Sequence, residues 1–316
     1  MVFFLQDDDT IMREPSTRGY LLVAAAAGLW GTLGLLFRAL HDAFGLSALT
    51  IAFLRAGIAL TILVVVLAII RPRLLQVPLR ALPFFAVYGF CGVAAYYFSY
   101  TQAVIQTTVT TAVVLLYAAP AFVTLIAWRV WGEPLGARKI IALALAFVGC
   151  ALVARAYDPA QLSLNLIGLG FGLAAGFTYA LYTVFSKSAL QRFSLWTALT
   201  YALLFGTLFL APLQTLDDFA PLLQPGAWAF LLALAVGPTL GSLALYSAGL
   251  RRVPASNASL VATIEPVVAS TLAFIFLGER LEFLQMVGGA MVIAGAVWLS
   301  LDRTNAVLAR TATRLR

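Results

Sequence analysis

Ten apolar stretches, each about as long as a membrane-spanning helix, follow one another along this chain with short loops between them. A helix needs roughly 20 apolar residues to cross a bilayer, so each stretch predicts one span. The predicted spans are residues 19–37, 47–70, 80–101, 108–131, 137–156, 165–187, 194–212, 227–249, 254–277 and 283–301. With 62% hydrophobic and 10% charged residues, the chain is too apolar for an ordinary soluble domain. We therefore expect an all-α integral membrane protein with ten transmembrane helices.

The distribution of basic residues predicts how the chain is oriented in the membrane. Loops that stay in the cytoplasm are enriched in Lys and Arg. With the N-terminus inside, sixteen Lys and Arg residues fall on the cytoplasmic side, while Arg38, Arg155 and Arg280 fall outside and Arg55 lies within a span. We expect both termini in the cytoplasm and the chain in the cell inner (cytoplasmic) membrane. This orientation explains the net charge of +7 without a nucleic-acid partner.

The second half of the sequence repeats the first half at an offset of 146 residues, the distance from position 117 to position 263. There YAAPAFVTLIAWRVWGEPLG aligns with TIEPVVASTLAFIFLGERLE. The alignment pairs Pro120 with Pro266, Gly132 with Gly278, and Glu133 with Glu279. Each copy contains five predicted spans, an odd number, so the two copies should cross the membrane in opposite directions. Such inverted repeats are typical of secondary transporters, whose substrate site lies near the midplane between the halves.

Several motifs resemble one family of membrane proteins. The run YSAGLRRVPASNASLVATIEPVVAS, within 246–299, resembles the second EamA repeat of the drug/metabolite transporter (DMT) superfamily. LWGTLGLLFRAL at 29–40 and the arginine of AFLRAGIAL resemble the start of the first repeat, and the resemblance covers residues 19–301. It implies two inverted five-helix repeats, a central cavity lined mainly by spans 1, 3, 4, 6, 8 and 9, and export of amino acids or related metabolites. Bacterial amino-acid exporters, including those of aromatic amino acids, are the most similar in character.

The repeat and the charge pattern divide the chain into four parts. Residues 1–17 are expected to form a polar N-terminal tail, 18–157 the first EamA-type repeat, 158–301 the second repeat, and 302–316 a basic cytoplasmic tail. Each repeat is expected to contribute five transmembrane helices.

Glu265 lies roughly 17 Å into the span at 254–277, near the middle of the hydrocarbon core. A carboxylate at this depth costs several kcal/mol unless it is protonated, paired or in contact with water. The repeat places Ala119 at the matching position, so the duplication does not require an acid. Glu265 either faces the cavity, where it binds an amino group or cycles a proton, or it is a structural acid held by neighbouring helices.

Pro120 and Pro266 occupy matching positions in the two repeats. A proline removes a backbone donor and clashes with the carbonyl four residues earlier, so the two spans should bend near Leu116 and Ala262. These bends are either hinges of the transport cycle or static kinks that neighbouring helices satisfy.

Aromatic and polar side chains within the spans are the other candidates for the cavity lining. Tyrosine combines a flat apolar body with a hydroxyl, which suits a neutral or zwitterionic organic substrate, although helix packing uses the same residues. The candidates are Trp30, Tyr88, Tyr96, Tyr117, Tyr179, Tyr182, Tyr246 and Asn257. Asn257 lies where its span begins, so it serves either to cap the helix or to bind near a helix N-terminus that attracts a substrate carboxylate. The resemblance implies that span 2 lies outside the cavity, which favours a structural role for Arg55. A functional role, such as a pair with Glu265 at a similar depth, is the alternative.

These features favour a secondary transporter that exports amino acids or related small metabolites by alternating access, either coupled to protons or facilitated, as a monomer or homodimer. The alternatives are a membrane-embedded enzyme and a non-transport scaffold. An enzyme is disfavoured because one histidine and scattered acids supply no catalytic constellation, and an ATP-driven pump because no phosphate-binding loop is present. Cys91 and Cys150 lie in apolar runs and are interpreted as buried hydrophobes, so we expect no disulfide, metal or cofactor.

Overall fold

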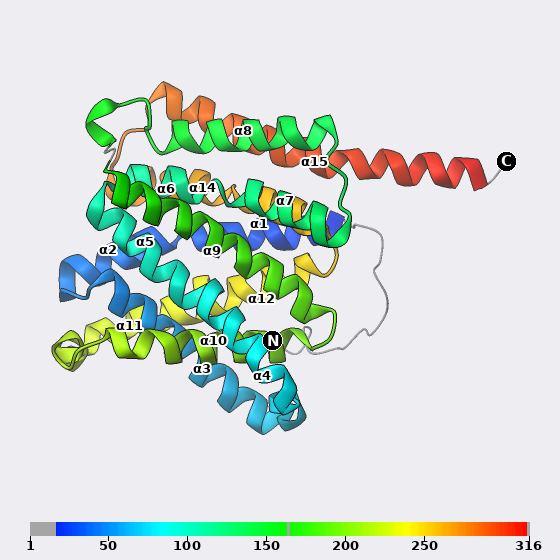
Figure 1. The fold of residues 1–316 in the computed structure, drawn as a ribbon. Coiled ribbons are helices and arrows are strands. Elements are labelled where there is room, and N and C mark those ends of the chain that lie inside the picture. Colours follow the sequence, from blue (N-terminus) through cyan, green and yellow to red (C-terminus); the bar gives the residue numbers. More distant parts are fainter. Residues whose placement is uncertain (1–16, 163–164, 315–316) are drawn as a thin grey trace.

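The computed structural model describes residues 17–162 and 165–314, with side chains described up to residue 300. The expected N-terminal tail therefore lies outside the described residues, apart from Thr17. Over the described ranges the chain is helical and contains no strand (Figure 1). The α-helices are α1 (Thr17–Gly31), α2 (Leu33–Phe44), α3 (Ala48–Ile70), α4 (Leu82–Gly89), α5 (Tyr96–Gln106), α6 (Val109–Leu116), α7 (Ala119–Trp131), α8 (Ala137–Val153), α9 (Leu166–Leu190), α10 (Leu195–Leu210), α11 (Pro225–Leu234), α12 (Ser242–Leu250), α13 (Ala255–Ala262), α14 (Glu265–Leu277) and α15 (Phe283–Arg314).

Within the described ranges, nine helical segments are long and apolar enough to cross a membrane. They correspond to nine of the ten predicted spans. The remaining span, predicted at 137–156, is α8, which has only 17 residues. At 1.5 Å per residue α8 is about 26 Å long, slightly less than the roughly 30 Å of a hydrocarbon core. The count of ten crossings therefore stays a prediction.

The internal repeat is visible in the positions at which helices break. The α6 and α7 bounds, shifted by the offset of 146 residues, coincide with those of α13 and α14. The predicted interruptions are present, because α6 ends at Leu116 and α13 ends at Ala262. Gly132 and Gly278 then end α7 and α14 with φ of 64° and 68°, a left-handed conformation that glycine adopts without strain.

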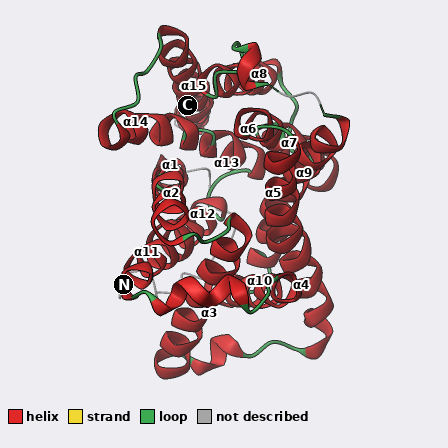
Figure 2. Cartoon of the chain, turned by 90° about the vertical axis from the view of Figure 1, so that its left-hand side faces the viewer, coloured by secondary structure: helices red, strands yellow, loops and turns green. Residues whose placement is uncertain are grey.

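The matching segments of the two repeats run in opposite directions. The end of α7 lies beside the start of α13, where the Ala255 amide donates to Glu133. The helices α8 and α15, which lie side by side (Figure 1), are antiparallel as well, because Gly149 packs against Gly288 and Gly295 packs against Ala142. We name the two ends of the bundle the Glu133 end and the Glu279 end after the matched glutamates. Viewed along the bundle from the Glu279 end, α12 lies in the interior with other helices around it (Figure 2).

Two further matched irregularities lie in the middle of spans. The chain forms π-helices at Phe90–Ala95, between α4 and α5, and at Ala235–Gly241, between α11 and α12. A π-helix inserts an extra residue into a turn and is frequent at functional sites. At Gly92 an added Cβ would lie 3.0 Å from the Cα of Tyr182, so the first π-segment packs closely against α9.

The contact between α8 and α15 gives a test of how α8 joins the bundle. A Cβ on Gly149 would lie 2.7 Å from the carbonyl oxygen of Gly288. We expect Gly149→Ala to lower the free energy of unfolding by about 1–3 kcal/mol, because a well-packed contact would be overfilled. Thermal unfolding in detergent measures this change. Gly170→Ala is the control, since an added Cβ there meets nothing within 4 Å. Equal stability of the two variants would contradict the observed packing.

Candidate functional site

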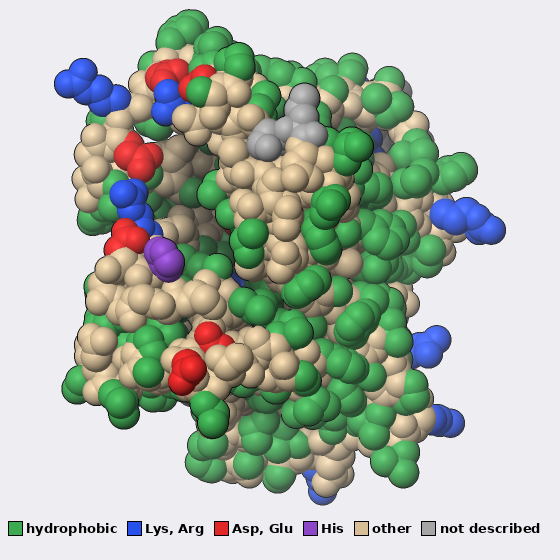
Figure 3. Space-filling view, turned by 60° about the vertical axis from the view of Figure 1, so that its left-hand side comes forward, with side chains coloured by type: hydrophobic (Ala, Val, Ile, Leu, Met, Phe, Trp, Pro, Cys, Tyr) green, Lys and Arg blue, Asp and Glu red, His purple; other side chains and the backbone are tan. Residues whose placement is uncertain are grey.

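A cavity of about 550 Å³ opens at the Glu279 end of the bundle. Residues of α1, α2, α3, α5, α6 and α14 line it, and Arg38 and Glu279 lie at its mouth. Figure 3 shows the hollow beside acidic, basic and histidine side chains. A second hollow of about 50 Å³ adjoins it and shares Trp30, Arg55 and Glu265 with its lining. The volume of the larger cavity is within the range of small-molecule sites, which is about 300–1,000 Å³.

The structure places six of the nine predicted lining residues on the walls of these hollows. They are Trp30, Tyr96, Tyr117, Tyr179, Tyr182 and Glu265, and Pro266 lies beside them. The linings do not include Pro120 or the other three predicted residues, Tyr88, Tyr246 and Asn257, which are buried. Which of these residues contact a substrate stays a prediction.

An aromatic cluster lies partly in the cavity wall and partly behind it. We define it by Trp30, Tyr88, Tyr182 and Tyr246. The ring centroids of Trp30 and Tyr246 are 5.2 Å apart, those of Tyr182 and Tyr246 6.4 Å, and those of Tyr88 and Tyr182 5.5 Å. The Tyr246 hydroxyl lies 2.8 Å from the hydroxyl of Thr183, which ties α12 to α9. Two of the predicted tyrosines thus lie behind the cavity wall because the inward face of a helix includes the packed core as well as the lining.

Glu265 is the first residue of α14, directly before Pro266. The break between α13 and α14 gives Glu265 a place at a helix N-terminus, where the helix dipole stabilises a negative charge. Its side chain is partly exposed to the cavity, and within the described chain it has no hydrogen bond or ion pair. A structural acid held by neighbouring side chains would show such partners, so the geometry favours a carboxylate available to a ligand.

The structure places Arg55 on the cavity wall, which corrects the expectation that span 2 stays outside the cavity. Ala48, Ala52 and Arg55 form one face of α3 and line the larger hollow. The guanidinium carbon lies 4.5 Å from the ring centroid of Tyr97 and 5.7 Å from that of Phe37. The sequence predicts only that Arg55 lies within a span, whereas the direction in which its side chain points depends on how α3 packs.

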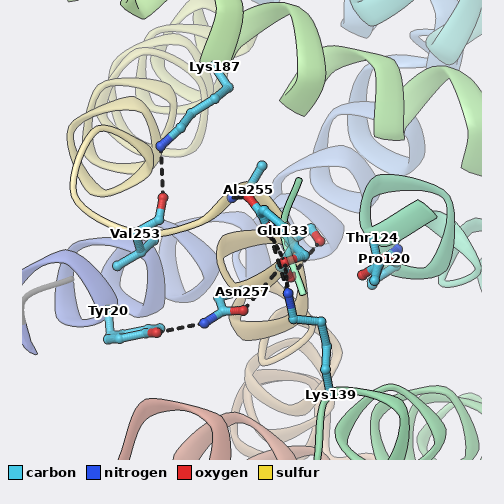
Figure 4. Close-up of polar contacts among 11 residues, drawn as sticks. Tyr20, Pro120, Thr124, Glu133, Lys139, Lys187, Val253, Ala255 and Asn257 are labelled. Atoms are coloured by element: carbon cyan, nitrogen blue, oxygen red, sulfur yellow. Dashed lines mark hydrogen bonds and ion pairs between the residues drawn. The ribbon is translucent and has the colours of Figure 1, made fainter. Parts of the chain in front are cut away.

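A buried polar network closes the Glu133 end (Figure 4). The Glu133 carboxylate accepts the backbone N–H of Ala255 at 2.8 Å and the hydroxyl of Ser256. Lys139 donates to the Ser256 hydroxyl at 2.7 Å and lies 3.5 Å from Glu133. These contacts join the turn after α7, and the start of α8, to the N-terminus of α13. No residue of this network lines either hollow.

Two further side chains, Asn257 and Lys187, make polar contacts that involve α1 and α9 at this end. The Asn257 amide donates to the Tyr20 hydroxyl at 2.8 Å, so this predicted lining residue instead joins α13 to α1. Lys187 donates to the backbone oxygens of Leu250 at 2.5 Å and of Val253 at 2.9 Å. A cation at these carbonyls suits the negative end of α12.

The matched Glu279 end is open. Glu279 contacts Arg38 at 3.3 Å, and both side chains are more than half exposed. In the other repeat, the positions that match Ala255 and Ser256 are Val109 and Thr110, at the start of α6. Both line the same cavity as Glu279, and among the described residues neither is hydrogen-bonded to Glu279. Nearby, Glu282 accepts from Arg155 and from the Tyr157 hydroxyl. Burial and the Glu282 carboxylate raise the pKa of Tyr157.

Two repeats that run antiparallel around a cavity open at one end define a membrane transporter, and the chain is a multi-pass protein of the inner membrane. More specifically, it belongs to the EamA-like transporter family, whose model matches residues 17–155 and 166–301. The model therefore matches the chain twice, once in each half.

Individual relatives carry the same class of description. An uncharacterized transporter of Archaeoglobus fulgidus is 34% identical over 70% of this chain and 76% of its own length. A probable terminal-alkyne amino-acid exporter of Streptantibioticus cattleyicolor is 29% identical over 82% and 85%. An uncharacterized inner membrane transporter of Salmonella typhimurium is 22% identical over 91% and 97%. A protein of known crystal structure matches with a TM-score of 0.78 and 18% identity, covering 91% of this chain and 98% of that protein, and shows the fold alone.

Proposed function

We propose that this protein is a secondary transporter that exports amino acids or related small metabolites by alternating access. The main observation that supports this proposal is that the cavity is open at the Glu279 end, whereas a buried network joins the helices at the Glu133 end. The basic residues near the Glu133 end support a cytoplasmic location for that end. The conformation would then be the outward-open state.

The cavity chemistry supports the proposed cargo. Aromatic rings supply flat apolar contact area, while Glu265 offers one carboxylate without a protein partner in the described chain. A substrate ammonium can bind such a carboxylate. The Streptantibioticus relative is described as a probable exporter of an amino acid, which supports the same class of cargo here.

The inverted repeat suggests what the opposite state looks like. If the two halves exchange conformations, Glu279 takes the role that Glu133 has in this structure. Glu279 would leave Arg38 and accept the backbone N–H groups of Val109 and Thr110, which now lie in the same cavity lining. The outer mouth would close as the Glu133 network opens. Gln285 occupies the position that matches Lys139, so the outer closure would lack the second charge.

The breaks at Pro120 and Pro266 support a hinge role for these residues. They separate the short helices α6 and α13 from α7 and α14 without continuous backbone hydrogen bonding. A short helix can tilt about such a break while the longer helix stays packed.

Reconstitution in liposomes tests the function. A panel of labelled amino acids should show counterflow for some members, and movement driven by an imposed pH gradient would establish coupling to protons. Movement that a pH gradient does not change would establish facilitated transport. Failure of every amino acid and related metabolite to move would overturn the proposal and favour a membrane-embedded enzyme or a scaffold. Light scattering of the purified protein distinguishes monomer from homodimer.

A further inference from the structure

Two opposite charges line the same cavity and attract each other across it without forming a hydrogen bond or an ion pair. Arg55 and Glu265 both contribute to the larger and the smaller hollow. In the part of the chain that is described, neither side chain makes a hydrogen bond or an ion pair within 4.0 Å. Arg55 is 6% exposed, and its Nε is buried without a hydrogen-bond partner.

The aromatic neighbours of Arg55 leave its donors unsatisfied. Tyr97 and Phe37 approach the guanidinium from their ring faces, at 4.5 and 5.7 Å. Such contacts stabilise the cation, but the five N–H groups lie in the guanidinium plane and need acceptors there. A guanidinium positioned by aromatic rings with unpaired donors beside a cavity is arranged to receive an anionic group of a ligand.

A carboxylate is the group that fits this arrangement. A guanidinium can donate two parallel hydrogen bonds to a carboxylate, which gives strength and orientation. A ligand with only a negative charge would leave Glu265 unpaired and would be repelled by it. A ligand with only a positive charge would leave Arg55 unpaired and would be repelled by it. One molecule with both charges close together satisfies both side chains.

We propose that Arg55 binds the α-carboxylate of a zwitterionic amino acid whose ammonium group binds Glu265. The apolar wall around the two charges, which includes Leu33 and Leu243, would receive an apolar side chain. This inference rests on the proposed function and narrows its substrate to molecules with a free α-carboxylate. It also makes Arg55 a specificity-determining residue.

The test compares ligands that differ by one charge. The probes are the amino acid of the liposome panel that moves fastest, its α-amide and its N-acetyl derivative, each titrated calorimetrically into the purified full chain. The wild-type protein should bind the two derivatives at least about 10-fold more weakly than the amino acid. Equal binding of all three by the wild-type protein would overturn the inference without any variant.

The variant Arg55→Gln then tests whether Arg55 is the residue that binds the α-carboxylate of the ligand. It should weaken amino-acid binding about 10- to 100-fold, yet change α-amide binding by less than about 3-fold, because the amide has no charge for Arg55 to meet. Arg55→Lys retains the cation but loses the two-pronged geometry, and should give an intermediate loss. The control Arg38→Gln removes an exposed cation at the cavity mouth and should leave the ratio between the two ligands unchanged.

The outcomes separate this inference from the proposed function. If amino acids move and Arg55→Gln weakens the amino acid and its amide equally, Arg55 is structural and only the inference fails. If Arg55→Gln does not fold, the ratio measured with Arg55→Lys decides in the same way. If no amino acid moves or binds in the wild-type protein, the proposed function itself fails.

Discussion

Replacing the buried Glu133 carboxylate by an amide, Glu133→Gln, is expected to move the protein out of the conformation seen in this structure, which we propose to be the outward-open state. The side chain accepts the Ala255 N–H and the Ser256 hydroxyl and lies beside Lys139, with both charged groups about nine-tenths buried. Removing one partner of a buried ion pair costs about 3 kcal/mol, since the other charge stays buried. That cost corresponds to a roughly 100-fold change in the conformational equilibrium.

Two single-cysteine reporters measure this change in a background with Cys91→Ser and Cys150→Ala. Ser270→Cys lies in the cavity lining, and Ser247→Cys is buried in α12, near the end that the network closes. With Glu133→Gln, a polar thiol reagent should label position 270 more slowly and position 247 faster. General unfolding would instead accelerate both reactions.

The matched variant is Glu279→Gln, at the same position of the other repeat. Its present partner Arg38 is exposed, so the outward-open state should lose less than about 1 kcal/mol. If Glu279 closes the opposite state, labelling at position 270 should stay equal or become faster. A slower reaction for both variants would contradict the exchange of roles between the two glutamates.

The second large effect is expected for Glu265→Gln, which keeps the shape of the side chain and removes its charge. Transport should slow about 10- to 100-fold, the usual consequence of losing a charge-assisted hydrogen bond to a ligand. Thermal stability should be retained, because within the described residues the Glu265 carboxylate makes no hydrogen bond or ion pair with a neighbouring side chain. Counterflow in liposomes and thermal unfolding in detergent provide the two measurements.

Asp42→Asn is the control for Glu265→Gln, since it removes an exposed carboxylate near the cavity mouth. It should leave the transport rate almost unchanged. Unchanged transport by Glu265→Gln, or a large loss of thermal stability, would identify Glu265 as a structural acid.

Much of the fold follows from the sequence because the bilayer restricts the choices. Apolar length predicted the nine segments that are long enough to span a membrane in the described residues, and the prolines at 120 and 266 predicted the breaks in two of them. Sequence spacing could not separate the cavity wall from the packed core, since both face inward. Tyr88 and Tyr182 show this, because their rings contact each other and only Tyr182 lines a hollow.

The polar contacts between distant segments were harder to predict. The repeat pairs Glu133 with Glu279, yet the contacts of Glu133 depend on Ser256, 123 residues later in the chain. Hydrogen-bonding residues at the start of α13 indicate a helix cap, but they do not predict that the Glu133 carboxylate is the acceptor. Only the antiparallel arrangement of the repeats brings the turn after α7 to that helix.

The balance of charges on the cavity wall has a consequence for energetics. The charges of Arg55 and Glu265 sum to zero, as do those of Arg38 and Glu279 at the mouth, and an amino-acid zwitterion adds no net charge to the cavity. The membrane voltage performs work of about 2.3 kcal/mol per elementary charge for each 100 mV. It performs almost none on a carrier that is neutral both empty and loaded. Concentration differences, rather than the electrical field, would then set the direction in which cargo leaves the cell, unless a proton accompanies it.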